Sequence, residues 1–120
     1  MRDEVYAIFI RGKIVAICEA ILNEEIGVIA GSRILCGLEP ELVKREARTW
    51  FQRDEDFITF VAINSETDHL PVDAERANWS AEALQRKDVE IAQAEASYKE
   101  DAFAACRKLI ERCALKEFST

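Results

Sequence analysis

The chain has 120 residues, of which 49% are hydrophobic and 32% are charged, and its formal net charge at pH 7 is −7. This length predicts one domain, residues 1–120, because single hydrophobic cores typically span about 100–150 residues. The composition is too apolar for a disordered chain, and the acidic excess argues against nucleic-acid binding, whose affinity comes largely from cations that neutralise phosphates.

The first predicted element covers residues 5–22. Apolar side chains recur there at intervals of three and four residues, which indicates a buried helix. A β-hairpin is the alternative for residues 5–17, because two β-rich runs flank the short sequence Arg11-Gly12-Lys13. We favour the helix, since the apolar pattern continues to Leu22 without alternating polar residues.

A second helix is predicted from about Glu24 to Leu35. Gly27 and Gly31 lie one turn apart within it, and a glycine costs a helix about 1 kcal/mol relative to alanine. The pair therefore suggests a close contact between helices, with a kinked connection as the alternative. Gly37 is typical of a helix stop, and Pro40 of the first turn of the next helix.

An amphipathic surface helix is predicted from Pro40 to Phe51. The next apolar run, residues 57–63, has the residue types of a strand, whereas the spacing of Phe57 and Phe60 also suits a two-turn helix. Periodicity does not decide so short a run. We favour a helix because the rest of the chain offers no obvious partner strand.

The last predicted helix is the longest. Ser80 suits an N-cap, and a heptad-like apolar stripe predicts one long helix from Val89 to Cys113, with a break allowed near Lys87-Asp88. The tail from Leu115 to Thr120 is expected to fray. Together these elements predict an all-α fold, a compact bundle of four or more helices with a long C-terminal helix.

Neither a membrane-spanning helix nor a targeting segment is predicted. The longest apolar stretch, residues 5–22, is interrupted by three charged side chains, whereas a spanning helix needs about 20 mostly apolar residues. The cysteines lack the CxxC spacing of a zinc or redox site, so we expect buried free thiols in a cytoplasmic protein. They are Cys18, Cys36, Cys106 and Cys113.

The longest polar passage without periodicity runs from Asn64 to Trp79 and contains the only histidine. Histidine titrates near neutrality, and neighbouring carboxylates can act as acids, bases or ligands of hard metals. The candidate ligand- or partner-binding residues are Glu66, Asp68, His69, Arg76 and Trp79. Zinc sites need several His or Cys ligands, and the Glu-x-x-His spacing of a di-iron site occurs once instead of twice. We therefore predict no metal ligand and no cofactor.

The same passage also suits a purely structural loop. Ser65 and Asp68 are typical of turns in which a side chain bonds back to the backbone, and Pro71 keeps the preceding residue out of helical geometry. Arg76 is expected to pair with Glu66 or Asp68, and Trp79 to anchor the loop on the last helix. No nucleophile elbow or phosphate-binding glycine loop is present, so no catalytic residue is predicted.

A longer pattern begins in this loop and continues into the predicted last helix. It consists of Ser65-Glu66-Thr67-Asp68-His69-Leu70-Pro71, Arg76, Trp79, Ala83-Leu84, Lys87-Asp88 and Glu90. In this pattern the chain resembles a family of small bacterial proteins of unknown function, and the likeness extends from about Ile21 to Ile110, with Gly31-Ser32-Arg33 and Asp56-Phe57 included. The resemblance implies a bacterial, cytoplasmic protein and implies no activity, cofactor or catalytic residue.

We therefore predict a non-enzymatic protein-interaction module, an immunity-type or regulatory protein whose acidic surface binds a basic partner such as a nuclease toxin. The alternative is a small-ligand or metal-dependent enzyme centred on residues 65–79. The apolar surplus of residues 5–35 also predicts a homodimer. Neither nucleic acid nor membrane is an expected partner.

Overall fold

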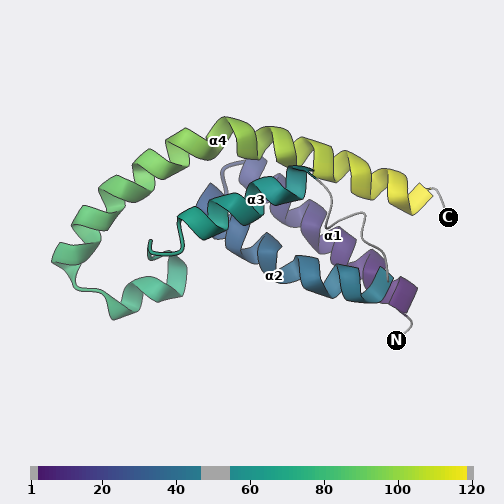
Figure 1. Cartoon of the computed structure of the whole chain (residues 1–120), viewed down its shortest axis with the longest axis horizontal. Coiled ribbons are helices and arrows are strands. Elements are labelled where there is room, and N and C mark those ends of the chain that lie inside the picture. The colour runs from purple at the N-terminus through teal and green to yellow at the C-terminus, as the bar shows by residue number, and fades with distance from the viewer. Residues whose placement is uncertain (1–2, 47–54, 119–120) are drawn as a thin grey trace.

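The protein is a bundle of helices, seen in a computed structural model that describes residues 3–46 and 55–118 (Figure 1). No strand occurs in these two ranges, so the predicted all-α fold with a long C-terminal helix is confirmed. The elements are α1 (Asp3–Leu22), α2 (Val28–Glu46), α3 (Glu55–Glu66), the 3-10 helix η1 (Asp73–Asn78) and α4 (Ala81–Phe118).

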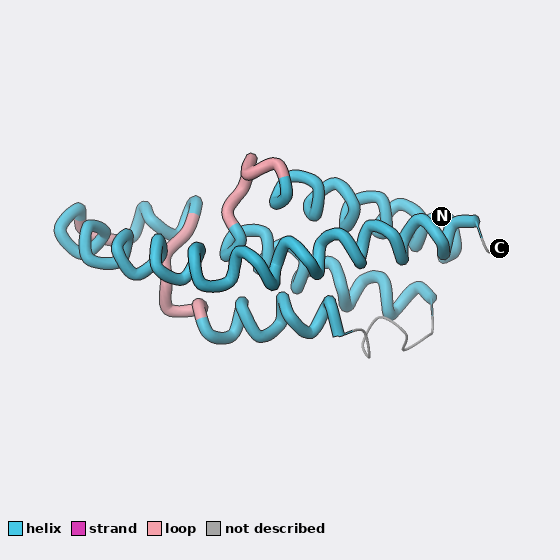
Figure 2. The backbone as a smooth tube through the Cα atoms, turned by 90° about the horizontal axis from the view of Figure 1, so that it is seen from above, coloured by secondary structure: helices cyan, strands magenta, loops and turns pink. Residues whose placement is uncertain are grey.

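The core lies where the C-terminal half of α4 passes over the other three α-helices. α1 packs against α2 and α4, and α3 also packs against α2 and α4. Figure 2 shows these helices from above, running roughly along the long axis of a molecule that measures 52 × 28 × 23 Å. Ile14, Phe57, Phe60 and Leu109 are fully buried at their junction, and burying side chains of this size contributes about 1.5–3 kcal/mol each.

α1 and α3 resolve the two choices between helix and strand in favour of helix. In α1 the buried residues recur every three or four positions, from Ala7 through Ile14 to Ile21, so one face of the helix meets the core. In α3 the buried residues Phe57, Phe60 and Ile63 follow the same helical spacing.

The predicted boundary at Gly37 and Pro40 is wrong, because α2 continues through both residues. Leu38 lies between them and packs against the core, which favours one continuous helix despite the cost of a proline in a helix interior, about 3 kcal/mol. The predicted start at Glu24 is also too early: Glu24 has a φ of 58° in the turn that separates α1 from α2. Residues 47–51 of the predicted amphipathic helix lie outside the described residues.

The glycines of the α1–α2 region confirm the predicted close helix contact. A Cβ added to Gly31 would lie 2.5 Å from Cδ1 of Ile21, so only glycine lets α2 approach α1 this closely. Gly27 meets α4 instead, since a Cβ there would lie 2.8 Å from Oε2 of Glu95.

α4 spans 38 residues without the break that was allowed near Lys87-Asp88. The Ser80 hydroxyl accepts the backbone N–H of Ala83 at 3.1 Å, which confirms the predicted N-cap. The helix runs on to Phe118, and residues 119–120 of the predicted tail lie outside the described residues. No helix of the described ranges is both long and apolar enough to cross a membrane.

All four cysteines are free thiols. Cys18, Cys106 and Cys113 are buried, as predicted, and they lie between α1 and α4. A hydrogen bond with Cys106 together with burial raises the pKa of Cys18 well above its usual range. Cys36 is only half-buried and donates its Sγ hydrogen to the carbonyl of Phe60 at 3.6 Å.

Candidate functional site

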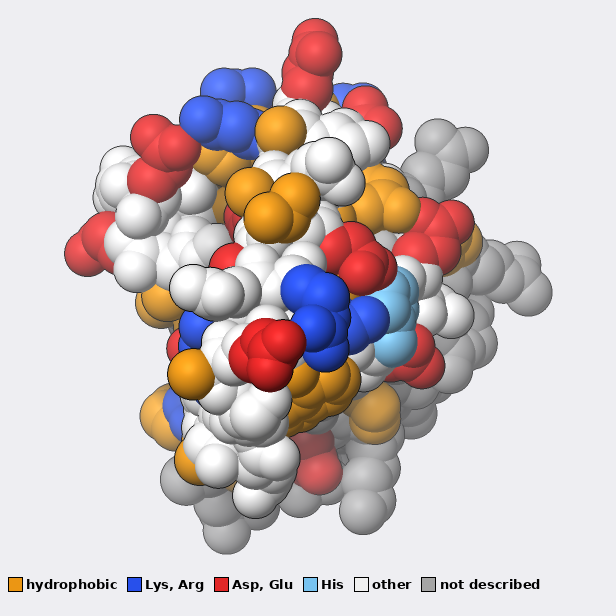
Figure 3. Space-filling model, turned by 90° about the vertical axis from the view of Figure 1, so that its left-hand side faces the viewer, with side chains coloured by type: hydrophobic (Ala, Val, Ile, Leu, Met, Phe, Trp, Pro, Cys, Tyr) orange, Lys and Arg blue, Asp and Glu red, His pale blue; other side chains and the backbone are white. Residues whose placement is uncertain are grey.

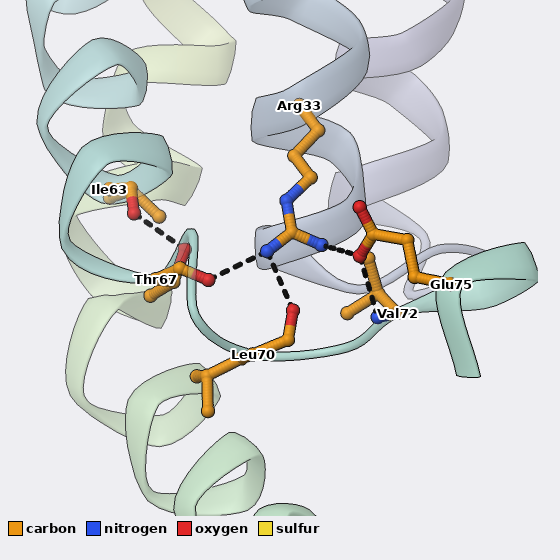
Figure 4. Close-up of polar contacts among 6 residues, drawn as sticks. All are labelled: Arg33, Ile63, Thr67, Leu70, Val72 and Glu75. Atoms are coloured by element: carbon orange, nitrogen blue, oxygen red, sulfur yellow. Dashed lines mark hydrogen bonds and ion pairs between the residues drawn. The ribbon is translucent and has the colours of Figure 1, made fainter. Parts of the chain in front are cut away.

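The loop between α3 and η1 is held by an arginine from α2. Arg33 Nη2 donates to the carbonyl oxygens of Thr67 at 2.6 Å and Leu70 at 2.7 Å, and Nη1 pairs with Oε1 of Glu75 at 2.6 Å (Figure 4). The planar guanidinium can bond three acceptors at once, which a lysine ammonium at the end of a flexible stem cannot do in the same geometry. Arg33, which belongs to α2, therefore fixes a loop that lies more than 30 residues later in the chain.

The loop also bonds to itself, but through Thr67 and not through the predicted side chains of Ser65 and Asp68, for which the described residues show no such bond. The Thr67 hydroxyl donates to the carbonyl of Ile63 at 2.6 Å, and the Leu70 N–H donates to the carbonyl of Thr67 at 3.0 Å. Oε1 of Glu75 accepts the Val72 N–H at 3.1 Å, beside its contact with Arg33. Thr67 and Leu70 are buried, so these bonds satisfy polar backbone groups that would otherwise lie unpaired.

Arg76 holds η1 against α4. Its Nη1 and Nη2 donate to the two carboxylate oxygens of Asp88 at 2.7 and 3.1 Å, and this hydrogen bonding lowers the pKa of Asp88. The expected pairing of Arg76 with Glu66 or Asp68 is wrong. The reason is the 3-10 helix, which turns Arg76 toward α4, whereas Glu66 and Asp68 lie before the loop's buried corner at Leu70 and Pro71.

Two further contacts join the loop region to α4. Nε2 of His69 contacts Oε2 of Glu90, and this contact lowers the pKa of Glu90, with a smaller contribution from Lys87 at 3.5 Å. The Tyr98 hydroxyl donates to Oε2 of Glu66, and this hydrogen bond raises the pKa of Tyr98. His69 and Glu90 are each about half exposed, at 49% and 44% of their side-chain area.

A hollow of about 280 Å³ lies between the loop and α4, and we call it the loop hollow. Figure 3 shows this end of the molecule, where acidic and basic side chains lie around the exposed histidine. The hollow is lined by Glu66, Thr67, His69, Leu70, Glu90, Gln93, Ala94, Ser97 and Tyr98. Its polar groups are two carboxylates, an imidazole, a phenol, two hydroxyls and an amide, all suited to binding a polar or cationic group.

The five predicted site residues are only partly brought together. Glu66 and His69 line the loop hollow, whereas Asp68, Arg76 and Trp79 do not. Asp68 is exposed, and Trp79 keeps 38% of its surface exposed. In the described ranges no three His, Cys, Asp or Glu side chains lie close enough together to hold a metal ion.

A second hollow, of about 390 Å³, lies between the α1–α2 turn and α4, on the opposite side of α4 from the loop hollow. The Glu95 carboxylate forms its wall and accepts the N–H groups of Val28 at 2.7 Å and Ile29 at 2.9 Å. Gly27 lies at the N-cap position of α2, since its carbonyl accepts the first helical bond, from Gly31 at 2.9 Å. Glycine has no side chain to cap the helix, and Glu95 supplies the missing acceptor.

Four residues of these sites were not predicted from the sequence: Arg33, Glu90, Glu95 and Tyr98. Arg33 and Glu90 belong to the pattern on which the family resemblance rests, which was the only indication of their importance. Tyr98 and Glu95 lie in the middle of a regular helix, where no local pattern distinguishes them from surface residues.

Comparison of the chain with protein-family models, with curated proteins and with solved structures finds no match. The family resemblance therefore stays a prediction.

Proposed function

We propose that this chain is a protein-interaction module, an immunity-type or regulatory protein that binds a basic partner protein. The binding segment is residues 66–75, from the end of α3 into η1, which we call the acidic loop. The observation that carries the proposal is the distribution of charge. Residues 54–75 contain seven carboxylates and no lysine or arginine, a charge equal to the formal net charge of −7 of the whole chain. The seven are Asp54, Glu55, Asp56, Glu66, Asp68, Asp73 and Glu75.

The carboxylates after α3 are displayed on a fixed backbone. Asp68 and Asp73 are exposed and have no hydrogen-bond or ion-pair partner within the described ranges, so they are available to a partner. Arg33 holds the backbone between them through Thr67 and Leu70. A fixed acidic loop attracts a basic partner over a distance, and it loses little conformational freedom when the partner binds.

A pair of charge-matched variants tests the proposal. Asp68→Asn with Asp73→Asn removes two charges from the loop, while Glu100→Gln with Asp101→Asn removes two from exposed positions on α4 that have no partner in the described ranges. Tagged wild-type protein is cross-linked in cells that naturally produce it. We expect a stoichiometric basic partner that the loop variant loses and the α4 variant keeps.

Two results of that experiment would reject the proposal. One is the absence of any stoichiometric partner of the wild-type protein. The other is equal retention of the partner by the loop variant and the α4 variant, because binding would then not depend on the loop carboxylates. With a purified partner, the association rate should fall as salt rises, since exposed charges are screened.

A second candidate function is the binding of a small cationic ligand in the loop hollow. It is favoured by the two carboxylates, Glu66 and Glu90, and the Tyr98 ring in one hollow of about 280 Å³. A thermal-shift screen of small amines and divalent metals tests it, because a ligand that binds only the folded state raises its melting temperature. A shift that Glu90→Gln abolishes would favour this candidate over the first.

The predicted homodimer is a separate proposal. α1 carries Val5, Ile8 and Phe9 with 49%, 49% and 52% of their surfaces exposed, which is more apolar surface than a surface helix requires. Sedimentation at several concentrations tests it: a mass that stays that of one chain up to high concentration would exclude a dimer.

A further inference from the structure

Burial changes abruptly along α4. No residue from Val72 to Asp101 is buried, whereas α4 then buries Ala102, Ala105, Cys106, Leu109 and Cys113 within a dozen residues. Figure 1 shows the consequence: the first half of α4 reaches beyond the bundle, with η1 folded back beneath it. We call residues 72–94 the arm.

The arm owes its helix to local preferences more than to packing. Its α4 portion is rich in alanine, glutamate, glutamine, lysine and arginine, which are strong helix formers. Glu82 and Arg86 add an ion pair across one helical turn at 3.8 Å. Such features make a helix only marginally stable in water, because most helical stability in proteins comes from packing an apolar face.

The ion pairs that join the arm to the rest of the molecule lie at its surface. Glu75 pairs with Arg33, and its carboxylate side chain is 55% exposed. Glu90 meets His69 where both side chains are about half exposed. Exposed ion pairs contribute little to stability. The pair between Arg76 and Asp88 lies within the arm and holds η1 to α4, so it moves with the arm.

Glu95 marks the point where α4 becomes firmly attached. Its carboxylate is bonded to the first two N–H groups of α2, immediately after the arm ends. About two turns later, from Ala102 on, the helix lies in the core. The tie at Glu95 thus separates a weakly held segment from a strongly held one within a single continuous helix.

We propose that the arm unfolds and refolds as a unit up to the tie at Glu95, while the bundle stays folded; we call the folded arm closed and the unfolded arm open. The loop hollow has Glu90, Gln93 and Ala94 of the arm on one side and Glu66, Thr67 and Leu70 of the bundle on the other. Opening therefore takes the hollow apart. A molecule that contacts both sides shifts the arm toward its closed state, because it binds that state better.

Native-state hydrogen exchange on the full chain tests the proposal. Amides of residues 85–94 should exchange about 100-fold or more faster than those of residues 102–113, because local opening exposes only the arm. Raising the salt concentration to 1 M should speed exchange in the arm by about two- to fivefold and leave residues 102–113 unchanged. Equal protection along both halves of α4 would overturn the proposal.

A substitution at one tie gives an independent measurement. Glu75→Gln weakens the contact with Arg33, and we expect exchange in residues 85–94 to rise about two- to fivefold with no change in residues 102–113. Glu100→Gln, at an exposed position without a partner in the described ranges, is the matched control and should change neither. Equal acceleration of both halves, or no acceleration of the arm, would show that the arm is not held as proposed.

Discussion

Replacing Glu95 by glutamine tests whether the start of α2 depends on a side chain of α4. The carboxylate accepts the N–H groups of Val28 and Ile29 at 2.7 and 2.9 Å. Glutamine has the same shape but keeps one acceptor oxygen, and its NH₂ group would face a backbone donor. The substitution also removes a negative charge from the positive end of the α2 dipole.

The expected loss follows from these two contributions. Removing an N-cap side chain costs about 0.5–2 kcal/mol, and a charge near a helix end contributes about 0.3–1 kcal/mol. We therefore expect Glu95→Gln to lower the free energy of unfolding by about 1–2 kcal/mol. Glu95→Ala leaves both N–H groups without their acceptor and should cost about 2–3 kcal/mol. At about 4 °C per kcal/mol, the glutamine variant should melt about 4–8 °C below the wild type.

Urea unfolding followed by circular dichroism measures these differences, with Glu100→Gln on the same helix as the control. The control should change stability by less than about 0.5 kcal/mol. Gly27→Ala completes a double-mutant cycle, because its Cβ would lie 2.8 Å from Oε2 of Glu95 and displace the carboxylate. The two losses should be clearly less than additive. Equal stability of Glu95→Gln and Glu100→Gln would refute the capping role.

Three further predictions follow from contacts described above. Gly31→Ala should destabilise the protein by about 1–3 kcal/mol in urea unfolding, because its Cβ would meet buried Ile21. Gly12→Ala is the control: its Cβ would meet nothing within 4 Å, and it should stabilise α1 by up to about 1 kcal/mol. Equal effects of the two substitutions would contradict the close packing of α2 on α1. Arg33→Ala should cost about 2–4 kcal/mol, because it leaves the Leu70 carbonyl without its donor and the Thr67 carbonyl with only the Leu70 N–H. His69→Ala should cost less than about 1 kcal/mol and leave partner binding intact; the reverse order would make His69 the anchor of the loop. Ultraviolet titration in a Tyr6→Phe background should show a raised pKa for Tyr98 that Glu66→Gln returns toward its usual value. Because the folded pKa is raised, the stabilising contact is fully present below about pH 10 and is lost as pH rises through the raised pKa. An unchanged pKa of Tyr98 in Glu66→Gln would exclude the hydrogen bond as the cause of the shift.

Helical periodicity predicted most of the fold, since each helix buries one stripe of side chains and that stripe is visible in the sequence. The long last helix shows this best, because Ala102, Cys106, Leu109 and Cys113 follow a regular spacing. Gly37 and Pro40 misled the prediction because both disfavour a helix locally, whereas the packing of Leu38 on the core favours continuing it. Local preference does not contain that tertiary contribution.

The candidate site was harder to predict because its contacts join residues far apart in the chain. The loop was identified from its turn-forming residues and its histidine, which are neighbours in sequence. Arg33, however, lies 34 residues before Thr67 and 37 before Leu70, and Glu95 lies 67 residues after Val28. The predicted partner of Arg76 was wrong for the same reason, since Glu66 and Asp68 come just before it in the sequence, whereas only the fold brings Asp88 to it.

The three thiols buried between α1 and α4 are natural probes of the unfolding of the bundle. Cys18, Cys106 and Cys113 have 0%, 0% and 1% of their surfaces exposed, and none of them lies in the arm. A thiol-alkylating reagent reaches them only when α1 separates from α4, whereas opening of the arm leaves them covered. Their rate of alkylation therefore reports how often α1 separates from α4, independently of any opening of the arm.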